Sequence, residues 1–245
     1  MTLKNTPQHA AMLWTGGKDS ALALHEAHDN GYPINCLVTF APPQADFLAH
    51  PLDVIKLQAQ ALALPHHVLV VEPPFEQSYE SGLRKLKQTF GIDCVITGDI
   101  AEVAGNPNWI SERSHPVGLT VYTPLWGRDR GVLLRQLLDK GIKARISCVN
   151  THWLTFDWVG RILDDAAMAE LLSISKQNGL DLCGENGEYH TMVVDGPMFQ
   201  QSIAINSYAT HNKDALRYME IHQMELKNQH EIEAINTTSS FFVTD

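Results

Sequence analysis

One stretch near the N-terminus decides the fold class: Met12-Leu13-Trp14-Thr15-Gly16-Gly17-Lys18-Asp19-Ser20-Ala21-Leu22. An apolar run passes through two adjacent glycines into a segment with helical periodicity. Adjacent glycines let backbone N–H groups converge without obstruction by Cβ atoms, and the start of a helix adds unpaired donors and a positive dipole end. The stretch therefore predicts a strand, a phosphate-binding turn and a helix.

The polar side chains of the turn suit a phosphate group as well. Lys18 adds positive charge, and Thr15 and Ser20 offer hydroxyl groups. Asp19 is placed either to cap the helix or to orient Lys18. The turn is not a Walker A loop, G-x-x-x-x-G-K-[ST], because Met12 and Asp19 occupy two of its required positions. A tight turn with a lysine that faces solvent is the simple structural alternative.

The first 150 residues alternate between short apolar runs and helical segments, which is typical of βαβ units around a parallel sheet. We expect strands at 10–14, 34–40, 67–71, 93–97 and 144–149, and helices at 19–30, 52–62, 76–89 and 129–140. Several of these helices end just before a glycine: Gly31, Gly91 or Gly141. The pattern predicts an α/β domain at residues 1–150.

The composition changes after Asn150, where aromatic and polar residues at 151–158 interrupt the alternation. We expect a second, smaller α+β domain at residues 151–205, which binds the substrate, with a helix at 165–177 and a strand at 191–194. Residues 206–245 are expected to form a C-terminal helix and tail. Trp153, Phe156 and Trp158 either line a cavity between the domains or pack as a hinge.

The composition excludes several classes of protein. Eighteen basic and 28 acidic side chains give a net charge of −10, which argues against general nucleic-acid binding. Four cysteines without a C-x-x-C pair argue against a zinc ribbon and favour a reduced, cytoplasmic setting: Cys36, Cys94, Cys148 and Cys183. No run approaches the roughly 20 apolar residues of a membrane span, and the N-terminus lacks the apolar core of a signal peptide. We therefore expect a soluble protein with no membrane partner.

The turn T-G-G-K-D-S at residues 15–20 resembles the S-G-G-x-D-S loop of the ATP pyrophosphatases, or N-type PP-loop enzymes, with Thr15 in place of the first serine. The resemblance implies an adenine nucleotide alpha hydrolase-like (HUP) domain. It also implies that ATP and Mg²⁺ bind at the loop, and that the loop holds the pyrophosphate which leaves when the α-phosphate is attacked.

Further segments resemble one family of these enzymes, the diphthine-ammonia ligases, through most of residues 10–200. The similar segments are Thr39-Phe40, His50-Pro51, Val95-Ile96-Thr97-Gly98-Asp99-Ile100 and Pro124-Leu125-Trp126. The most specific segment, C-G-E-N-G-E-Y-H-T at residues 183–191, is similar to the family signature C-G-E-G-G-E-Y-E-T. Val194-Asp195-Gly196-Pro197 and Phe199 follow it.

This resemblance implies three sets of site residues. The nucleotide-binding set is Thr15, Gly16, Gly17, Lys18, Asp19, Ser20, Thr39, His50 and Gly98. The catalytic set is Lys18, Asp99 and Glu188, with Asp99 also expected to bind the metal ion. The substrate-binding set is Glu185, Asn186, Glu188, His190 and Thr191.

The implied reaction is that of an amide ligase, which adenylates a carboxylate and transfers free ammonia to it. Asn186 and His190 depart from the signature, and the second departure resembles a bacterial branch for which a role in cobalamin salvage has been suggested. The acceptor is therefore either diphthine on elongation factor 2 or a corrinoid or other small carboxylate. RNA base modification and a non-catalytic ATP sensor remain alternatives, and a homodimer remains open.

Overall fold

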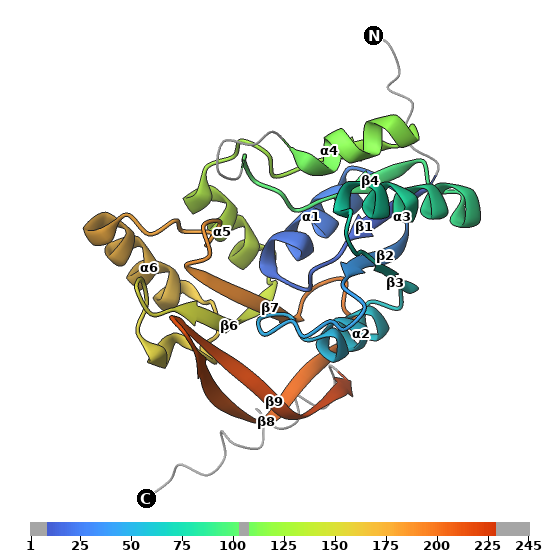
Figure 1. The fold of residues 1–245 in the computed structure, drawn as a ribbon. Coiled ribbons are helices and arrows are strands. Elements are labelled where there is room, and N and C mark those ends of the chain that lie inside the picture. Colours follow the sequence, from blue (N-terminus) through green and yellow to red (C-terminus); the bar gives the residue numbers. More distant parts are fainter. Residues whose placement is uncertain (1–8, 103–107, 229–245) are drawn as a thin grey trace, which may run out of the picture.

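The first of two sheets is parallel, as the sequence predicts (Figure 1). The computed structural model describes residues 9–102 and 108–228. The strand order β3-β2-β1-β4-β5 places β1 at the centre. The strands are β1 (Ala10–Leu13), β2 (Ile34–Ala41), β3 (His66–Val70), β4 (Cys94–Ile96) and β5 (Thr120–Tyr122). The short β5 is a strand that the sequence pattern did not predict.

Helices cover both faces of this sheet. They are α1 (Lys18–Asp29), α2 (Leu52–Ala61), α3 (Phe75–Phe90) and α4 (Trp109–Ser114), with the short 3₁₀ helix η1 (His115–Val117) after α4. Helix α5 (Arg130–Asp139) follows in the chain and contacts α6 (Asp165–Asn178) instead. Successive side chains of a strand point to opposite faces. Met12 accordingly packs in the core cluster that holds α1 and α2, whereas Leu13 packs in a second cluster with α3.

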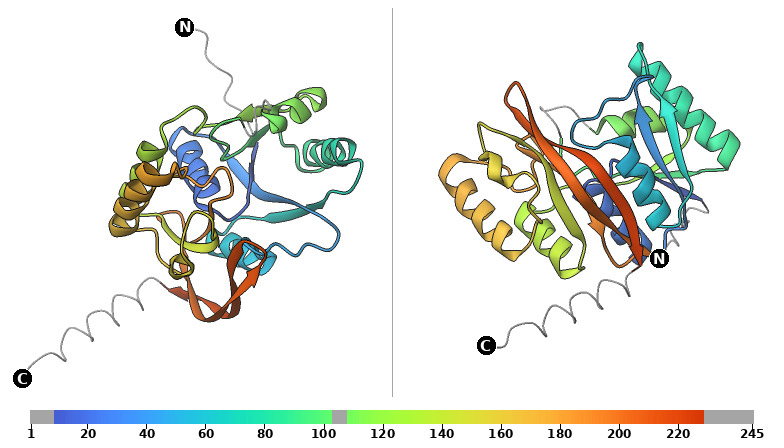
Figure 2. Two further views of the ribbon diagram at one scale, coloured as in Figure 1. Left: turned by 60° about the vertical axis from the view of Figure 1, so that its left-hand side comes forward. Right: turned by 90° about the horizontal axis from the view of Figure 1, so that it is seen from below.

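The second sheet is antiparallel, with the order β7-β6-β9-β8 (Figure 2). Its strands are β6 (Lys143–Asn150), β7 (Tyr189–Asp195), β8 (Gln201–Lys213) and β9 (Leu216–Asn228). The 3₁₀ helix η2 (Phe156–Trp158) and helix α6 (Asp165–Asn178) lie between β6 and β7 in the chain. The expected fold class, a parallel α/β part with a smaller α+β part, is confirmed.

Two expectations about this second sheet are wrong. The strand expected at 144–149 as part of the parallel sheet is β6, which pairs with β7 and β9 instead. A buried apolar run is compatible with either sheet, so periodicity does not choose between them. The helix expected from residue 206 is the β8–β9 hairpin as far as residue 228, and residues 229–245 lie outside the described part. A register shift between Ile205 and Ser207 interrupts the strand alternation there and hides it in the sequence.

Helix α1 lies between the two sheets and connects them. It contacts β1 and β4 of the first sheet and β7 of the second. One core cluster includes Met12 from β1, Leu24 from α1 and Val193 from β7. The turn before α1 is therefore enclosed by the parallel sheet on one side and by β7 on the other. No helix in the described ranges is both long and apolar enough to cross a membrane.

Candidate functional site

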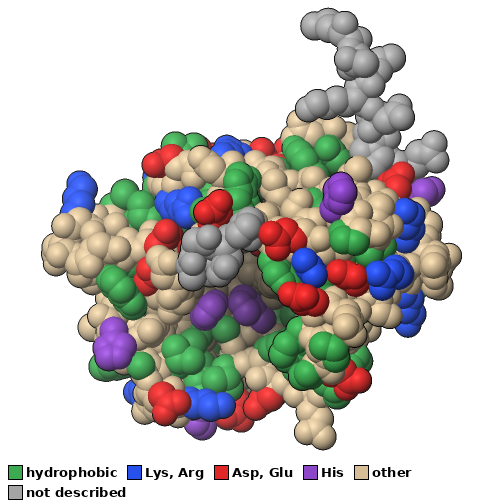
Figure 3. Space-filling model, turned by 45° about the horizontal axis from the view of Figure 1, so that its top comes forward, with side chains coloured by type: hydrophobic (Ala, Val, Ile, Leu, Met, Phe, Trp, Pro, Cys, Tyr) green, Lys and Arg blue, Asp and Glu red, His purple; other side chains and the backbone are tan. Residues whose placement is uncertain are grey.

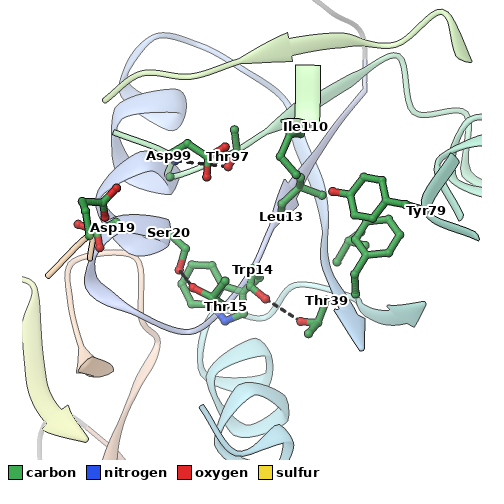
Figure 4. A pocket seen from close by; sticks show the side chains of 14 residues that line it. Leu13, Trp14, Thr15, Asp19, Ser20, Thr39, Tyr79, Thr97, Asp99 and Ile110 are labelled. Carbon is green, nitrogen blue, oxygen red and sulfur yellow. Dashed lines mark hydrogen bonds between the residues drawn. The ribbon is translucent and has the colours of Figure 1, made fainter. Parts of the chain in front are cut away.

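A cavity of about 360 Å³ opens at the carboxyl ends of β1, β2 and β4 (Figure 4). From β1 the chain continues to β2 and β3 on one side of the sheet, and then crosses over to β4 and β5 on the other side of β1. Open parallel sheets bind ligands at such a crossover point, outside the carboxyl ends of the strands. The topology by itself therefore makes this cavity a candidate binding site.

The cavity wall is apolar on one side and polar on the other. The apolar side is formed by Leu13, Trp14, Val38, Phe40, Tyr79 and Ile110. The hydroxyl groups come from Thr15, Ser20, Thr39 and Thr97, and the carboxylates from Asp19, Asp99 and Glu185, with Gly98 completing the wall. An apolar slot beside hydroxyls and carboxylates suits a ligand with a flat ring at one end and a charged group at the other.

Two glycines allow the turn after β1 to adopt its shape. Gly16 has a φ of +79°, and a Cβ there would collide with the side-chain oxygen of Gln58. A Cβ on Gly98 would lie 2.7 Å from the backbone nitrogen of Ser20, so the β4 end packs directly on the start of α1. Larger residues at either position would displace the turn.

The hydroxyl groups of the turn bond to one another and to its backbone. Thr15 Oγ1 donates to Ser20 Oγ at 3.2 Å, and Ser20 Oγ donates to the Gly17 carbonyl oxygen at 2.9 Å. The Gly17 N–H donates to Thr15 Oγ1 over a long distance of 3.4 Å. That weak contact leaves the Gly17 donor available for a stronger acceptor.

Lys18 is buried, with 3% of its surface exposed, so the alternative of a lysine facing solvent is wrong. Its Nζ donates to Asp19 at 2.7 Å and to the Cys183 carbonyl oxygen, and its backbone N–H donates to Thr191 Oγ1 at 3.0 Å. Burial alone would lower the pKa of Lys18, but the neighbouring Asp19 carboxylate outweighs it and the pKa is raised. Asp19 therefore orients Lys18, whereas Gly17 occupies the N-cap.

A second cavity of about 310 Å³ lies beside the first and shares Thr15, Asp19 and Glu185 with it. Its other lining residues are Gly17, Lys18, His50, Cys183, Gly184, Gly187, Tyr189, His190 and Thr191. Figure 3 shows histidine side chains in a hollow of the surface, in agreement with this lining. Residues from both sheets therefore meet around the turn.

Two imidazoles face each other in the second cavity. The rings of His50 and His190 meet edge to face, with 5.5 Å between their centroids. Burial, then His190 and Lys18, lowers the pKa of His50 to about 3. The pKa of His190 is lowered too, first by burial and then by Lys18. Both rings are therefore neutral near pH 7 and offer hydrogen bonds without charge.

The two glutamates of the signature segment occupy different environments. Glu185 lines both cavities, and burial, followed by the charge of Asp19, raises its pKa to about 7. Glu188 is 1% exposed and lines neither cavity. Its carboxylate accepts hydrogen bonds from the backbone N–H groups of Asp181 and Asn186 and from the Asn186 side chain. Glu188 therefore holds its own loop in shape.

Comparison with known proteins identifies the family. Residues 8–120 match the diphthamide synthase N-terminal domain, and residues 129–226 match the diphthamide synthase C-terminal domain. This chain belongs to the diphthamide synthase family. It is 28% identical to the diphthine–ammonia ligase of Bos taurus and 27% identical to that of Homo sapiens, in each case over 86% of this chain and 91% of the relative. The family expected from the sequence motifs is confirmed.

Two further likenesses are more distant. The diphthine–ammonia ligase of Schizosaccharomyces pombe is 25% identical over 85% of this chain, which spans 38% of that longer protein. A solved structure titled as a predicted subunit of tRNA methyltransferase from Methanocaldococcus jannaschii has a TM-score of 0.44 and 17% identity. It covers 77% of this chain and 97% of that one, and nothing about function follows from a likeness this weak.

Most residues expected at the site of this diphthamide synthase family member do lie around the two cavities. One or both cavities are lined by the phosphate turn (residues 15–20), Thr39, His50, Gly98 and Asp99, and by Glu185, His190 and Thr191 of the signature segment. The exception is Gly16, which packs on Gln58 behind the turn. Asn186 and Glu188 do not line them. Thr191 of the signature segment bonds the backbone of Lys18 in the turn directly.

The carboxylates of the first cavity fit the expected Mg²⁺. Asp19, Asp99 and Glu185 line the same wall. Burial raises the pKa of Asp99, which a bound cation would reverse. Within the described ranges, no three His, Cys, Asp or Glu side chains come close enough to form a metal site by themselves. Mg²⁺ usually takes one or two carboxylates together with substrate phosphates, so this arrangement agrees with the ion.

Sequence reasoning missed two residues of the site. Tyr79 from α3 closes the apolar side of the first cavity, where its ring stacks on Phe40 with 3.9 Å between centroids. Gln58 from α2 is completely buried beneath the phosphate turn. In the sequence, Gln58 shares one helical face with the apolar residues Val54, Ile55 and Ala59, and this spacing was the signal that could have indicated its burial.

Proposed function

We propose that this chain is an ATP-dependent ligase that adenylates a substrate carboxylate and transfers ammonia to it, releasing AMP and pyrophosphate. The observation that carries the proposal is the contact between the phosphate turn and the signature segment, in which Lys18 bonds both Asp19 and the Cys183 carbonyl. That contact joins a nucleotide cavity to a second polar cavity, as a two-substrate ligase requires. The diphthine–ammonia ligases named above give the class of reaction.

The nucleoside of ATP is proposed to occupy the apolar side of the first cavity, against Trp14 and Tyr79, with its phosphates at the turn. The Gly17 N–H and the buried, charged Lys18 stabilise the negative charge of the leaving pyrophosphate. Asp99, with Asp19 beside it, would hold Mg²⁺ against the phosphate oxygens. The bound ion would offset charge that builds up on those oxygens.

The acceptor carboxylate and ammonia are proposed to meet between the cavities, where Glu185 lines both. A carboxyl group with a pKa of about 7 can take up a proton near neutral pH. Ammonia must lose a proton as it replaces AMP on the acyl-adenylate. We assign Glu185 to accept that proton, in place of Glu188.

The acceptor is diphthine on elongation factor 2 or a small carboxylate such as a corrinoid acid. His190 favours the second, because a neutral imidazole replaces the signature glutamate and removes a negative charge from the acceptor cavity. A cytoplasmic setting accompanies the proposal, and a homodimer stays a prediction. RNA base modification and an ATP sensor without turnover are the competing functions.

The deciding experiment screens candidate acceptors in the presence of ATP labelled at its α-phosphate, ammonia and Mg²⁺. The panel contains diphthine-bearing elongation factor 2, corrinoid acids and an undermodified tRNA. AMP and pyrophosphate released in equal amounts, only when both carboxylate and ammonia are present, would support the ligase. ADP and orthophosphate as products, or ATP binding without turnover for every member of the panel, would contradict it.

A further inference from the structure

Gln58 lies beneath the phosphate turn, on the buried face of α2. Its Oε1 accepts a hydrogen bond from Trp14 Nε1 at 2.9 Å. Its Nε2 donates to the carbonyl oxygens of Gly16, at 2.9 Å, and Val193, at 2.8 Å. The amide thus uses both donors and links β1, the turn and β7. The opposite amide orientation would point Oε1 at two carbonyl oxygens, so these contacts settle it.

These contacts fix the direction of one peptide group. The Gly16 carbonyl oxygen accepts from Gln58 Nε2 and also from the Val193 N–H, each at 2.9 Å. In a trans peptide the C=O and the following N–H point in opposite directions. Holding the Gly16 carbonyl toward α2 and β7 therefore turns the Gly17 N–H toward the second cavity, which Gly17 lines.

Without such an anchor, the peptide between two glycines rotates at little cost, because neither residue carries a Cβ. The rotated peptide would present the Gly16 carbonyl oxygen, a negative dipole end, to the phosphate groups. The Gln58 amide and the Val193 N–H together therefore keep the turn offering a donor, and not an acceptor, to an anion.

We propose that Gln58 is a positioning residue, which holds the Gly16–Gly17 peptide in the orientation that binds the phosphates of ATP. This inference rests on the proposed function of the turn. Its consequence is larger for the phosphates than for the nucleoside, since two of the three hydrogen bonds of Gln58 hold the turn and β7 and only one holds Trp14 of the nucleoside slot. Losing the anchor therefore weakens the binding of phosphate-bearing ligands more than the binding of adenosine. A residue that merely supported the fold would affect both equally.

The test compares Gln58→Met, which keeps the side-chain length, with Gln60→Met at an exposed position of the same helix. Dissociation constants for ATP, pyrophosphate and adenosine are measured by calorimetry on the full chain. We expect Gln58→Met to lose about tenfold in affinity for ATP and pyrophosphate, the size of one hydrogen bond to a charged group. Its adenosine affinity should fall clearly less than its pyrophosphate affinity, and Gln60→Met should match wild type throughout.

Equal losses for adenosine and pyrophosphate, or no loss at all, would overturn the positioning role. If Gln58→Met does not fold, Gln58→Glu decides by the same comparison, because it still accepts from Trp14 but no longer donates to both carbonyls. Amide hydrogen exchange separates this role from the function of the turn. Faster exchange at Gly17 and Val193 in the variant supports the anchor even if wild type binds no ATP, a result that refutes only the proposed function. Unchanged exchange refutes the anchor.

Discussion

The phosphate turn at residues 15–20 and the signature loop at residues 183–191 each contain two glycines, and both border the same two cavities. In the turn, the hydroxyls of Thr15 and Ser20 and the carboxylate of Asp19 line the cavities, as expected from the sequence. In the signature loop, one of two glutamates faces the cavities and the other turns inward to bond its own backbone. Spacing thus indicates a loop of a given shape, whereas packing decides which of its charges reaches a ligand.

The largest expected effect tests the contact between the two loops. Lys18→Met keeps the length of the side chain but removes the charge held between Asp19 and Cys183. We expect AMP formation to fall by about 10²–10³-fold, as when one stabilising donor is lost from a reaction site. Initial rates at saturating ATP measure it, with the exposed Lys56→Met as the matched control. A rate equal to that of wild type would separate the two loops functionally.

The next effect distinguishes the two glutamates by stability. The backbone N–H groups of Asp181 and Asn186 bond different oxygens of Glu188, so Glu188→Gln places an amide N–H₂ against one of the two donors, and we expect the free energy of unfolding to fall by about 1–3 kcal/mol. Urea denaturation measures it. Glu185→Gln, the matched change, should not lower the free energy of unfolding near neutral pH, because it removes a buried carboxyl group that ionises there, but it should lower AMP formation. The reverse result, with activity lost and stability kept in Glu188→Gln, would return the catalytic role to Glu188.

The pH dependence of stability sharpens the same contrast. Because burial raises the pKa of Glu185 to about 7 in the folded protein, the folded state retains a proton that the unfolded state loses at lower pH. Stability from this group is therefore present at acidic pH and declines as the pH rises toward 7. We expect the decline in melting temperature between about pH 5 and pH 7 to be shallower in Glu185→Gln. Parallel melting curves for the two proteins would show that Glu185 has an ordinary pKa.

The smallest expected effect on nucleotide binding comes from His190→Glu. The change places a carboxylate opposite His50 without touching the first cavity, so the ATP dissociation constant should stay within a few-fold of wild type. The acceptor preference should move toward diphthine, because the signature residue is restored. Competition between diphthine-bearing elongation factor 2 and the best small carboxylate measures it. A strong loss of ATP affinity with no change of preference would place position 190 in the nucleotide site.

Much of the fold follows from patterns within single segments. The strand, glycine turn and helix around Gly16 are visible in the order of residues, and the helix C-cap Gly91 is found in the left-handed conformation as expected. The β8–β9 hairpin was missed because its polar, register-shifted strands lack a clear period. Its hydrogen bonds come from pairing between strands, which no local pattern records.

The sequence by itself determined the family, the strand, turn and helix around Gly16, and most of the residues around the cavities, because these depend on residue types at fixed local spacing. Tertiary structure alone decided that β6 joins the second sheet and that Lys18 is buried between two loops. It also decided that Glu185, and not Glu188, reaches the cavities. Such choices depend on partners far away in the chain: the atoms that solvate or bond a charged group arrive only when the two sheets pack together.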